Sequence, residues 1–277
     1  MTYPFLKGHG TENDFVLLPD LDGSIHGGRS AEELAERVRA LCDRRAGIGG
    51  DGVLRVVRAS GPGAEWFMDY RNADGSLSEM CGNGIRLFVR YLVDTGLADP
   101  ATPIRVDTRD GVKTLTVDGD LITADMGTPT VLGDTTVIAD GITWAARHVD
   151  MGNPHAVAFV SRLEEPGPLL EPPRHDPAVF PDGVNVEFVV RRGERHIAMR
   201  VHERGSGETR SCGTGACAAM VATAVAHHDR PGAGDGQSDV AYRVDVPGGT
   251  LTVTWTADDR ILLTGPAVVV ASGTTDL

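Results

Sequence analysis

The chain has 277 residues, 41% of them hydrophobic, and is long enough for one large domain or two of ordinary size. Its formal net charge of −13 argues against nucleic acids or anionic membranes as main partners, because both surfaces would repel it. No stretch reaches the roughly 18 apolar residues of a membrane-spanning helix, and residues 1–10 do not resemble a signal peptide. We expect a cytoplasmic protein with a small-molecule ligand, no nucleic-acid or membrane partner, and cysteines kept as thiols.

The basic side chains are almost all arginine, since Lys7 and Lys113 are the only lysines among 26 basic residues. An enzyme that uses pyridoxal phosphate needs a lysine for the Schiff base, and neither lysine lies in a promising motif. Cys212 and Cys217 fall on different faces of a predicted helix and have no second pair of metal-ligating residues. We therefore expect neither a pyridoxal cofactor nor a metal site.

The N-terminal segment predicts two short strands separated by a polar break at residues 8–14. Asn13 in this break is a candidate ligand contact, although an Asx turn is the plainer interpretation. Ser30 and Glu33 form a capping box that begins an amphipathic helix. The glycine-rich turn at residues 47–52 is not followed by a helix, which excludes a dinucleotide or P-loop site.

A predicted strand at residues 66–70 leads to Asn72, and the polar stretch that follows ends in Cys81-Gly82-Asn83-Gly84. The Gly-Asn-Gly sequence can expose backbone N–H groups at the start of the apolar helix predicted at residues 85–92, where an anion can bind. Asp110-Gly111 and Asp118-Gly119 are hairpin signals. The first half is therefore predicted to be a mostly antiparallel sheet around one nearly buried helix.

The second half of the chain repeats this plan. Asn153 and His155 precede a strand, and a proline-rich connector at residues 164–181 is expected to be a surface loop. Cys212-Gly213-Thr214-Gly215 begins a helix rich in alanine and valine, and residues 227–239 are predicted to form a solvated loop. Strands are predicted at residues 156–160, 184–188, 197–202, 250–255 and 261–264, and residues 268–270 are expected to return to the first sheet.

A cysteine at the start of a helix meets the positive end of the helix dipole and free N–H groups, which favour the thiolate. We therefore expect the pKa of Cys81 and of Cys212 to fall from about 8.5 towards neutral, as a general base requires. If pseudo-twofold symmetry brings the two helix starts face to face, a carbon acid between them has a base on one side and an acid on the other. That arrangement allows stereoinversion, while spare N–H groups hold a carboxylate.

Plainer interpretations stay open for single residues. Either cysteine alone is explained by packing at a tight helix start, but the two share a context, since Asn72 and Glu203 each lie nine residues before their cysteine. His155 is open to interpretation as a satisfied loop histidine, and Glu203 with Arg204 as a surface ion pair. A thiol redox protein that uses the two cysteines and a non-catalytic binding protein are the alternatives from other functional classes.

At these residues the sequence closely resembles the diaminopimelate epimerase family, a group of amino-acid racemases and epimerases that use two cysteines and no pyridoxal phosphate. The resemblance extends over nearly the whole chain. The motifs that carry it are His9-Gly10, Asn13-Asp14-Phe15, Asn72-Ala73-Asp74-Gly75-Ser76, Cys81-Gly82-Asn83-Gly84, Gly152-Asn153-Pro154-His155, Val184-Asn185, Glu203-Arg204-Gly205, Gly207-Glu208-Thr209, Cys212-Gly213-Thr214-Gly215 and Pro247-Gly248-Gly249.

The resemblance implies an α+β fold of two pseudo-symmetric domains, each a mostly antiparallel sheet or barrel around a central helix. Residues 1–127 with 266–277 would form the domain that carries Cys81, residues 128–265 the domain that carries Cys212, and the cleft between them the active site. The implied reaction is the cofactor-independent epimerisation of LL-2,6-diaminoheptanedioate to the meso isomer, in lysine and peptidoglycan biosynthesis. Whether the chain assembles as a homodimer stays open.

In the family the matching cysteines are the two bases, which implies that Cys81 and Cys212 exchange the roles of thiolate and thiol with the direction of reaction. His155 is an auxiliary residue. The implied substrate contacts are Asn13, Asn72, Gly82, Asn83, Asn153, Asn185, Glu203, Arg204, Gly213 and Thr214.

The chain departs from the family pattern at a few positions. Gly52 stands where many members have glutamine, so that contact is expected to be absent or replaced by backbone or water. Gly8 and Glu12 also differ from common family choices and bear on recognition of the distal end of the substrate. The nearest alternative is a related two-cysteine racemase of proline, hydroxyproline or histidine, against which Arg204 argues because it can bind a second carboxylate.

Overall fold

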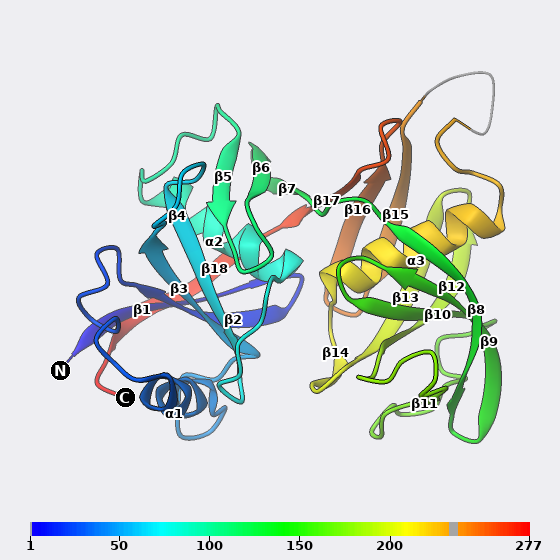
Figure 1. Cartoon of the computed structure of the whole chain (residues 1–277), viewed down its shortest axis with the longest axis horizontal. Helices are drawn as coiled ribbons and strands as arrows, with labels where there is room; N and C mark the ends of the chain where they lie inside the picture. Colours follow the sequence, from blue (N-terminus) through cyan, green and yellow to red (C-terminus); the bar gives the residue numbers. More distant parts are fainter. Residues whose placement is uncertain (1, 233–237) are drawn as a thin grey trace. The chain divides into compact units, whose positions relative to one another are not determined.

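The computed structural model describes residues 2–232 and 238–277, which form two compact units (Figure 1). Unit 1 comprises residues 1–124 and 265–277, and unit 2 comprises residues 125–264. Each unit is mostly antiparallel β-structure around a buried helix, which confirms the predicted α+β class. Of the loop predicted at residues 227–239, residues 233–237 lie outside the described part of the chain.

The helices of unit 1 are α1 (Ala31–Cys42) and α2 (Gly82–Asp94). Its strands are β1 (Tyr3–Gly10), β2 (Asn13–Pro19), β3 (Gly52–Arg58), β4 (Trp66–Asn72), β5 (Ile104–Asp107), β6 (Lys113–Asp118), β7 (Leu121–Asp125) and β18 (Val268–Thr275). They pair in the order β18–β1–β2–β3–β4–β5–β6–β7, in which β2–β3 and β4–β5 are parallel and the other pairs are antiparallel.

Both helices of unit 1 begin at the polar residues that the sequence indicates. Ser30 Oγ accepts the Glu33 N–H at 3.2 Å and the Glu33 carboxylate accepts the Ser30 N–H at 2.7 Å, which confirms the capping box. Cys81 caps α2, whose apolar side chains are buried against β1, β2, β3 and β18. The cysteine is therefore fixed at the point where a buried helix begins.

The break between the first two strands is shorter than the predicted residues 8–14. β1 continues to Gly10, Thr11 and Glu12 form the turn with φ of 49° and 60°, and Asn13 begins β2. Positive φ at both central positions is the feature of a type I′ hairpin turn, whose twist matches that of paired strands. Residues other than glycine, asparagine and aspartate rarely adopt it, so the residue types did not indicate so tight a turn.

The helix of unit 2 is α3 (Gly213–Ala226). Its strands are β8 (Thr130–Ala139), β9 (Ile142–Asp150), β10 (Pro154–Phe159), β11 (Arg174–His175), β12 (Asn185–Gly193), β13 (His196–Glu203), β14 (Gly207–Thr209), β15 (Val240–Val246), β16 (Gly249–Trp255) and β17 (Ile261–Pro266). They pair in the order β11–β8–β9–β10–β12–β13–β15–β16–β17, and β14 also pairs with β13. Among these described pairs, β10–β12 and β13–β15 are parallel and the others are antiparallel.

Helix α3 is enclosed by strands of its own unit, as its lack of a polar face predicts. It packs against β9, β10, β12, β13, β15 and β16, and its residues from Gly215 to Ala224 are buried. Its many alanines let the surrounding strands approach the helix backbone closely. Figure 1 shows α3, in gold, beside these strands.

Two parts of unit 2 differ from the prediction. The proline-rich connector is more than a surface loop, since Leu169 and Phe180 are only 4% and 2% exposed and β11 within it pairs with β8. These apolar side chains belong to the core beneath β8 and β12, so their burial anchors the connector on unit 2. The long hairpin β8–β9 is absent from the prediction, although its turn is an Asp140-Gly141 dipeptide with φ of 48° and 76°.

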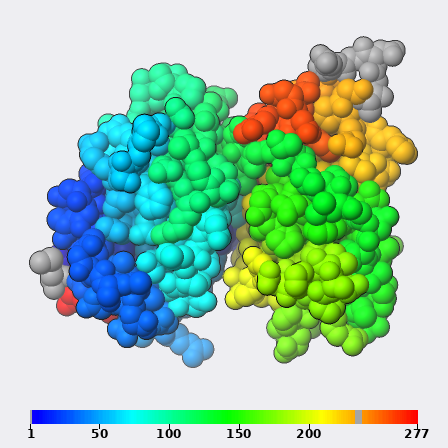
Figure 2. Space-filling view, viewed as in Figure 1, coloured from blue at the N-terminus to red at the C-terminus, as the bar shows by residue number. Residues whose placement is uncertain are grey.

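The last strand returns to unit 1, as expected for residues 268–270. β18 pairs antiparallel with β1, with Tyr3 opposite Thr275. The two ends of the described chain therefore lie side by side, as the N and C marks in Figure 1 and the neighbouring blue and red atoms in Figure 2 show.

Candidate active site

In unit 1, Cys81 is the N-cap of α2. Its sulfur accepts the backbone N–H of Gly84 at 3.3 Å, and the extended backbone of the cysteine, with φ of −140°, turns the side chain back over the first helical turn. Gly82 and Asn83, two predicted substrate contacts, are the first residues of the helix and are buried. The helix start predicted from the Cys-Gly-Asn-Gly motif is confirmed.

Asn13 lies beside this cysteine. Its Nδ2 donates to the Asp51 carboxylate at 2.7 Å, while its Oδ1 accepts from Asn83 Nδ2 at 3.1 Å and faces Cys81 Sγ at 3.6 Å. Asn13 is only 7% exposed and belongs to a strand, so the Asx-turn interpretation is wrong. The residue instead connects a carboxylate to the cysteine.

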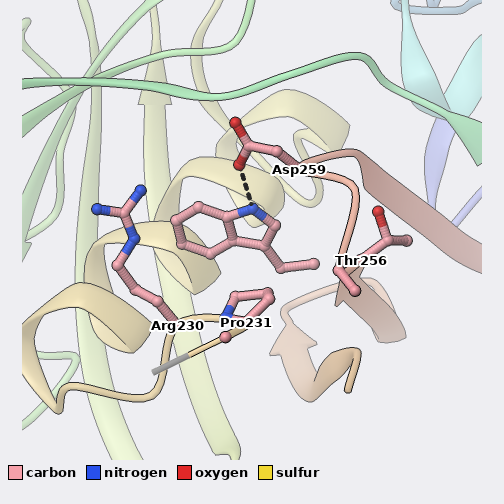
Figure 3. Close-up of a pocket in the computed structure, with 7 residues that line it drawn as sticks. Arg230, Pro231, Thr256 and Asp259 are labelled. Carbon is pink, nitrogen blue, oxygen red and sulfur yellow. Dashed lines mark hydrogen bonds between the residues drawn. The ribbon is translucent and has the colours of Figure 1, made fainter. Parts of the chain in front are cut away.

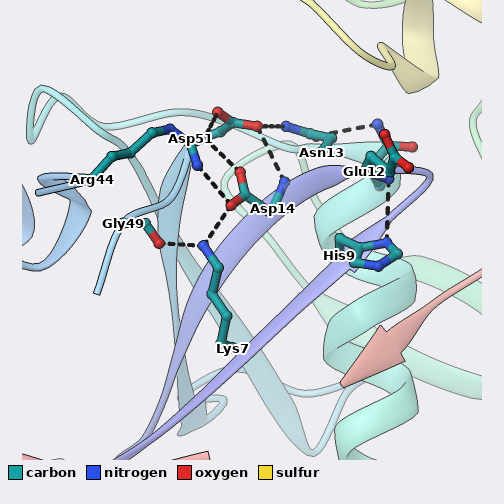
Figure 4. Close-up of polar contacts among 9 residues, drawn as sticks. Lys7, His9, Glu12, Asn13, Asp14, Arg44, Gly49 and Asp51 are labelled. Atoms are coloured by element: carbon teal, nitrogen blue, oxygen red, sulfur yellow. Dashed lines mark hydrogen bonds and ion pairs between the residues drawn. The ribbon is translucent and has the colours of Figure 1, made fainter. Parts of the chain in front are cut away.

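The carboxylate that holds Asn13 belongs to a charged cluster at the edge of unit 1 (Figure 4). Arg44 donates to both oxygens of Asp14 at 2.7 and 2.9 Å and to Asp51 at 2.6 Å, and Lys7 pairs with Asp14 at 2.5 Å. Burial alone would raise the pKa of Asp14, but the hydrogen bonds from Arg44 and Lys7 outweigh it and hold that pKa well below its usual range. Burial raises the pKa of Asp51, and the charge of Asp14 adds to this against the hydrogen bond from Asn13.

Asn72, at the end of β4, is held by two hydrogen bonds. Its Oδ1 accepts from the Tyr70 hydroxyl at 2.8 Å and its Nδ2 donates to Ser76 Oγ at 3.0 Å. Gly52 is directly opposite Asn72 in the sheet, and a Cβ there would lie 2.5 Å from the Arg71 carbonyl oxygen and 2.8 Å from the Tyr70 ring. A side chain at position 52 would collide with the Arg71 backbone and with the Tyr70 ring, a restriction that the sequence did not suggest.

In unit 2, Cys212 is the N-cap of α3. Its sulfur accepts the Gly215 N–H at 3.3 Å and lies 3.5 Å from the Thr214 hydroxyl, so the predicted helix start is confirmed here as well. The predicted fall of its pKa is wrong. Burial raises the pKa of Cys212 well above its ordinary value, the charges of Glu203 and Glu187 raise it further, and the hydrogen bonds from Thr214 and Gly215 only oppose this.

His155 connects Cys212 to a buried carboxylate. His155 and Glu187 are both fully buried and their Nδ1 and Oε1 atoms are 2.7 Å apart. On the other side, His155 Nε2 lies 2.9 Å from Asn153 Oδ1, and Asn153 Nδ2 donates to Thr214 Oγ1 at 3.4 Å. A Cβ on Gly215 would lie 2.7 Å from Glu187 Oε1, so the carboxylate packs against the start of α3. His155 is therefore a strand residue in a polar chain, and its interpretation as a loop histidine is wrong.

The remaining predicted contacts of unit 2 surround the ends of β12 and β13. Asn185 donates to the Pro154 carbonyl at 3.0 Å and accepts the Arg204 N–H at 3.0 Å, so it joins two strand ends. The Arg204 guanidinium donates to the Asp182 carbonyl at 3.2 Å, and the Glu203 carboxylate accepts from the Thr209 hydroxyl. Gly213 begins α3 and is buried.

Three residues that sequence reasoning did not single out support these sites, namely Asp51, Tyr70 and Glu187. Glu187 had a signal, because it is the one charged residue in the buried part of β12, residues 185–190, whereas Arg191 and Arg192 are exposed at its end. Asp51 lies in a glycine-rich turn that indicates only backbone flexibility, and the position of Tyr70 over Gly52 depends on strand register. Residue type and spacing do not report register across a sheet.

A further pocket in unit 2 lies beside Trp255 (Figure 3). Trp255 Nε1 donates to Asp259 Oδ1 at 2.8 Å, and the Arg230 guanidinium lies 4.9 Å from the indole centroid. The lining residues are Arg230, Pro231, Gly232, Trp255, Thr256, Ala257 and Asp259, and they include none of the predicted site residues.

Within residues 2–232 and 238–277, no group of three or more His, Cys, Asp and Glu side chains is arranged to hold a metal ion. None of the helices in this described part is long and apolar enough to cross a membrane.

Known structures share the fold at low sequence identity. A phenazine biosynthesis protein of the PhzF family from Bacillus anthracis matches with a TM-score of 0.76 and 16% identity, over 100% of both chains. A hydroxyproline epimerase from Agrobacterium vitis matches with a TM-score of 0.71 and 18% identity, over 100% of this chain and 93% of the other. These similarities establish the two-unit fold alone.

Sequence relatives are much closer. The diaminopimelate epimerase of Streptomyces coelicolor is 55% identical, over 98% of this chain and 95% of its own. The diaminopimelate epimerase of Corynebacterium glutamicum is 44% identical, over 99% of this chain and 98% of its own. The sequence model of the family described as diaminopimelate epimerase matches residues 5–132 and 147–270. The chain therefore belongs to the diaminopimelate epimerase family.

Proposed function

We propose that the chain interconverts LL- and meso-2,6-diaminoheptanedioate by a two-base mechanism without a cofactor. The observation that carries the proposal is the matched pair of cysteines, each the N-cap of a buried helix and each hydrogen-bonded at sulfur to the third residue after it. Family membership supports the substrate, since relatives 44% and 55% identical over nearly their whole length carry the name of this activity.

In this mechanism one sulfur is a thiolate and removes the α-proton from one face of the substrate, so that an S–H bond forms and the C–H electron pair passes to the α-carbon and its carboxylate. The other sulfur is a thiol and delivers its proton to the opposite face. Cys81 and Cys212 then have exchanged protonation states, and the reverse reaction restores them. The backbone N–H groups of Gly82, Asn83, Gly213 and Thr214 are proposed to hold the reacting carboxylate, whose negative charge grows in the transition state.

The distal amino acid group is proposed to contact the polar side chains of Asn13, Asn72, Asn153, Asn185, Glu203 and Arg204. Asn185 supports this, because it accepts the Arg204 N–H directly after the end of β13 and donates to the Pro154 carbonyl at the start of β10. A guanidinium and a carboxylate together suit a second amino-carboxylate. His155 is proposed to act through Asn153 and Thr214 rather than on the substrate.

The domain assignment is part of the same proposal. Residues 1–127 with 266–277 are proposed to carry Cys81, residues 128–265 to carry Cys212, and substrate to bind in a cleft between these domains. A cytoplasmic location and a homodimer complete it, and sedimentation of the purified chain tests the dimer.

The substrate assignment is tested with a panel of purified amino acids. The chain is incubated with LL-diaminopimelate, proline, hydroxyproline and histidine, and the products are separated by chiral chromatography. We expect conversion of diaminopimelate alone. Racemisation of another amino acid, with diaminopimelate unchanged, would contradict the proposed substrate while leaving the two-cysteine chemistry intact.

A further inference from the structure

Asp51 is a partly buried carboxylate that the proposed mechanism does not use. Its two oxygens face three hydrogen-bond donors, with Arg44 at Oδ1 at 2.6 Å, and Asn13 Nδ2 and the Asp14 N–H at Oδ2 at 2.7 and 3.1 Å (Figure 4). A carboxylate satisfies all of them, because both of its oxygens only accept.

The direction of the Asn13 amide follows from these contacts. Because Asp51 accepts from Nδ2, the amide oxygen must point the other way, towards Asn83 and Cys81. Asn83 Nδ2 donates to that same oxygen at 3.1 Å, which independently requires an acceptor there. An amide oxygen has no hydrogen to give, so its contact with Cys81 Sγ uses the thiol hydrogen.

We propose that Asp51 is a positioning residue that keeps the Asn13 amide oxygen turned towards Cys81 and so holds this cysteine as a thiol before the substrate arrives. The thiol form has an acceptor for its hydrogen, whereas the thiolate would face the partial negative charge of an oxygen. The inference deepens the proposed function, on which it rests for the catalytic role of Cys81.

The charged and titratable groups that face Asp51 belong to three elements. Asp14 comes from β2, Lys7 from β1 reaches the cluster through Asp14, and Cys42 with Arg44 comes from the end of α1. Arg44 and Lys7 neutralise the two carboxylates, so the cluster directs the amide without leaving its negative charge uncompensated.

The Asp51→Asn variant breaks the arrangement without changing its size. An asparagine has one oxygen for three donors, and when that oxygen meets Arg44 its NH₂ group faces Asn13. Asn13 then loses the acceptor for its Nδ2, and Asn83 alone still holds the amide oxygen in place. We expect the Asn13 amide to turn in part of the protein and point Nδ2 at Cys81 Sγ, which favours the thiolate instead of the thiol. Removing the Asp51 charge would favour the thiolate as well, so the experiment must separate the two causes.

The measurement is the rate at which iodoacetamide alkylates Cys81, followed by peptide mass spectrometry in full-length Cys212→Ala protein at about pH 7.5. A hydrogen bond changed at a charged group shifts a pKa by about one unit, and the lower nucleophilicity of the more acidic thiolate offsets part of the gain. Asp51→Asn is therefore expected to alkylate about threefold faster. The matched control is Asp22→Asn, which changes an exposed loop carboxylate and should leave the rate unchanged.

Two further variants decide the cause. Asn13→Ala removes the acceptor and is expected to accelerate alkylation by itself, which keeps the proposal testable if Asp51→Asn does not fold. In the Asn13→Ala background, Asp51→Asn should add only the smaller effect of the lost charge, well below threefold. An alkylation rate equal to that of the Cys212→Ala parent, in either Asp51→Asn or Asn13→Ala, would overturn the proposal. A full threefold acceleration by Asp51→Asn in the Asn13→Ala background would also overturn it, because the lost charge would then be the cause. Epimerase activity of the unmodified chain is measured separately, so failure of the proposed function is distinguishable.

Discussion

The sulfur of Cys212 accepts the Gly215 N–H at a helix start and lies within hydrogen-bond distance of the Thr214 hydroxyl, and its pKa is still raised. A helix N-terminus contributes about 0.3–1 kcal/mol to a nearby anion, which is less than the cost of burying an uncompensated charge. The negative charges of Glu203 and Glu187 add to that cost. The helix start is therefore a good place to bind a carboxylate, but in this fold it does not by itself create a thiolate.

The raised pKa of Cys212 has a direct consequence for pH dependence. A thiol with a raised pKa loses its proton only as the pH rises, so the fraction of protein in which Cys212 is a thiolate is small at neutral pH and increases with pH. In the reaction direction in which Cys212 is the base, we expect kcat/KM to rise by up to about tenfold per pH unit from pH 6 to pH 8. Initial rates in overlapping buffers measure this, and a rate independent of pH over that range would show that a thiolate is already formed.

Substitution of either N-cap cysteine should remove most of the activity. Cys81→Ala and Cys212→Ala each leave one face of the α-carbon without a proton carrier, and we expect kcat/KM to fall by at least about 10³-fold. Chiral chromatography of the product measures the loss. Cys42→Ala is the matched control, because that cysteine is a core residue whose pKa burial raises to about 12, and it should retain the rate.

At the scale of elements, the sequence predicts best where one residue determines the local structure. Ser30 with Glu33, Cys81, Cys212 and the Asp110-Gly111 turn all have the predicted roles, because caps and tight turns depend on a few neighbouring residues. The contacts of Asp51, Tyr70 and Glu187 depend instead on which strands are neighbours. Pairings such as β10 with β12 bring distant segments together, so spacing along the chain does not reveal them.

The pair formed by Glu187 and His155 is expected to stabilise the strands around α3. Glu187→Ala leaves the buried His155 Nδ1 without its partner and opens a cavity, and removal of one member of a buried pair costs about 3–5 kcal/mol. Urea unfolding monitored by circular dichroism measures the free energy of unfolding. Glu194→Ala in the exposed turn between β12 and β13 is the control, and equal stability of the two variants would contradict a structural role for the pair.

At the scale of the whole molecule, the two units repeat one plan. Each has a helix that is capped by a cysteine and enclosed by its own strands. In unit 1, Asn13 faces the Cys81 sulfur and is held by Asp51. In unit 2, Asn153 reaches Cys212 through Thr214 and is linked by His155 to Glu187. The repeated cysteine motif predicts this plan from sequence. The supporting carboxylates were not predicted, because Asp51 and Glu187 occupy different elements and leave no shared motif.

In the reacting complex, Cys81 and Cys212 are proposed to have opposite protonation states and to invert one α-carbon of diaminopimelate. The decisive experiment incubates the purified chain with LL-diaminopimelate in D₂O and analyses the products by chiral chromatography and mass spectrometry. We expect meso-diaminopimelate that carries one deuterium at the inverted α-carbon, because the proton delivered comes from a solvent-exchanged thiol and not from the substrate. Failure to form the meso isomer, or a meso product that retains the original hydrogen, would contradict it.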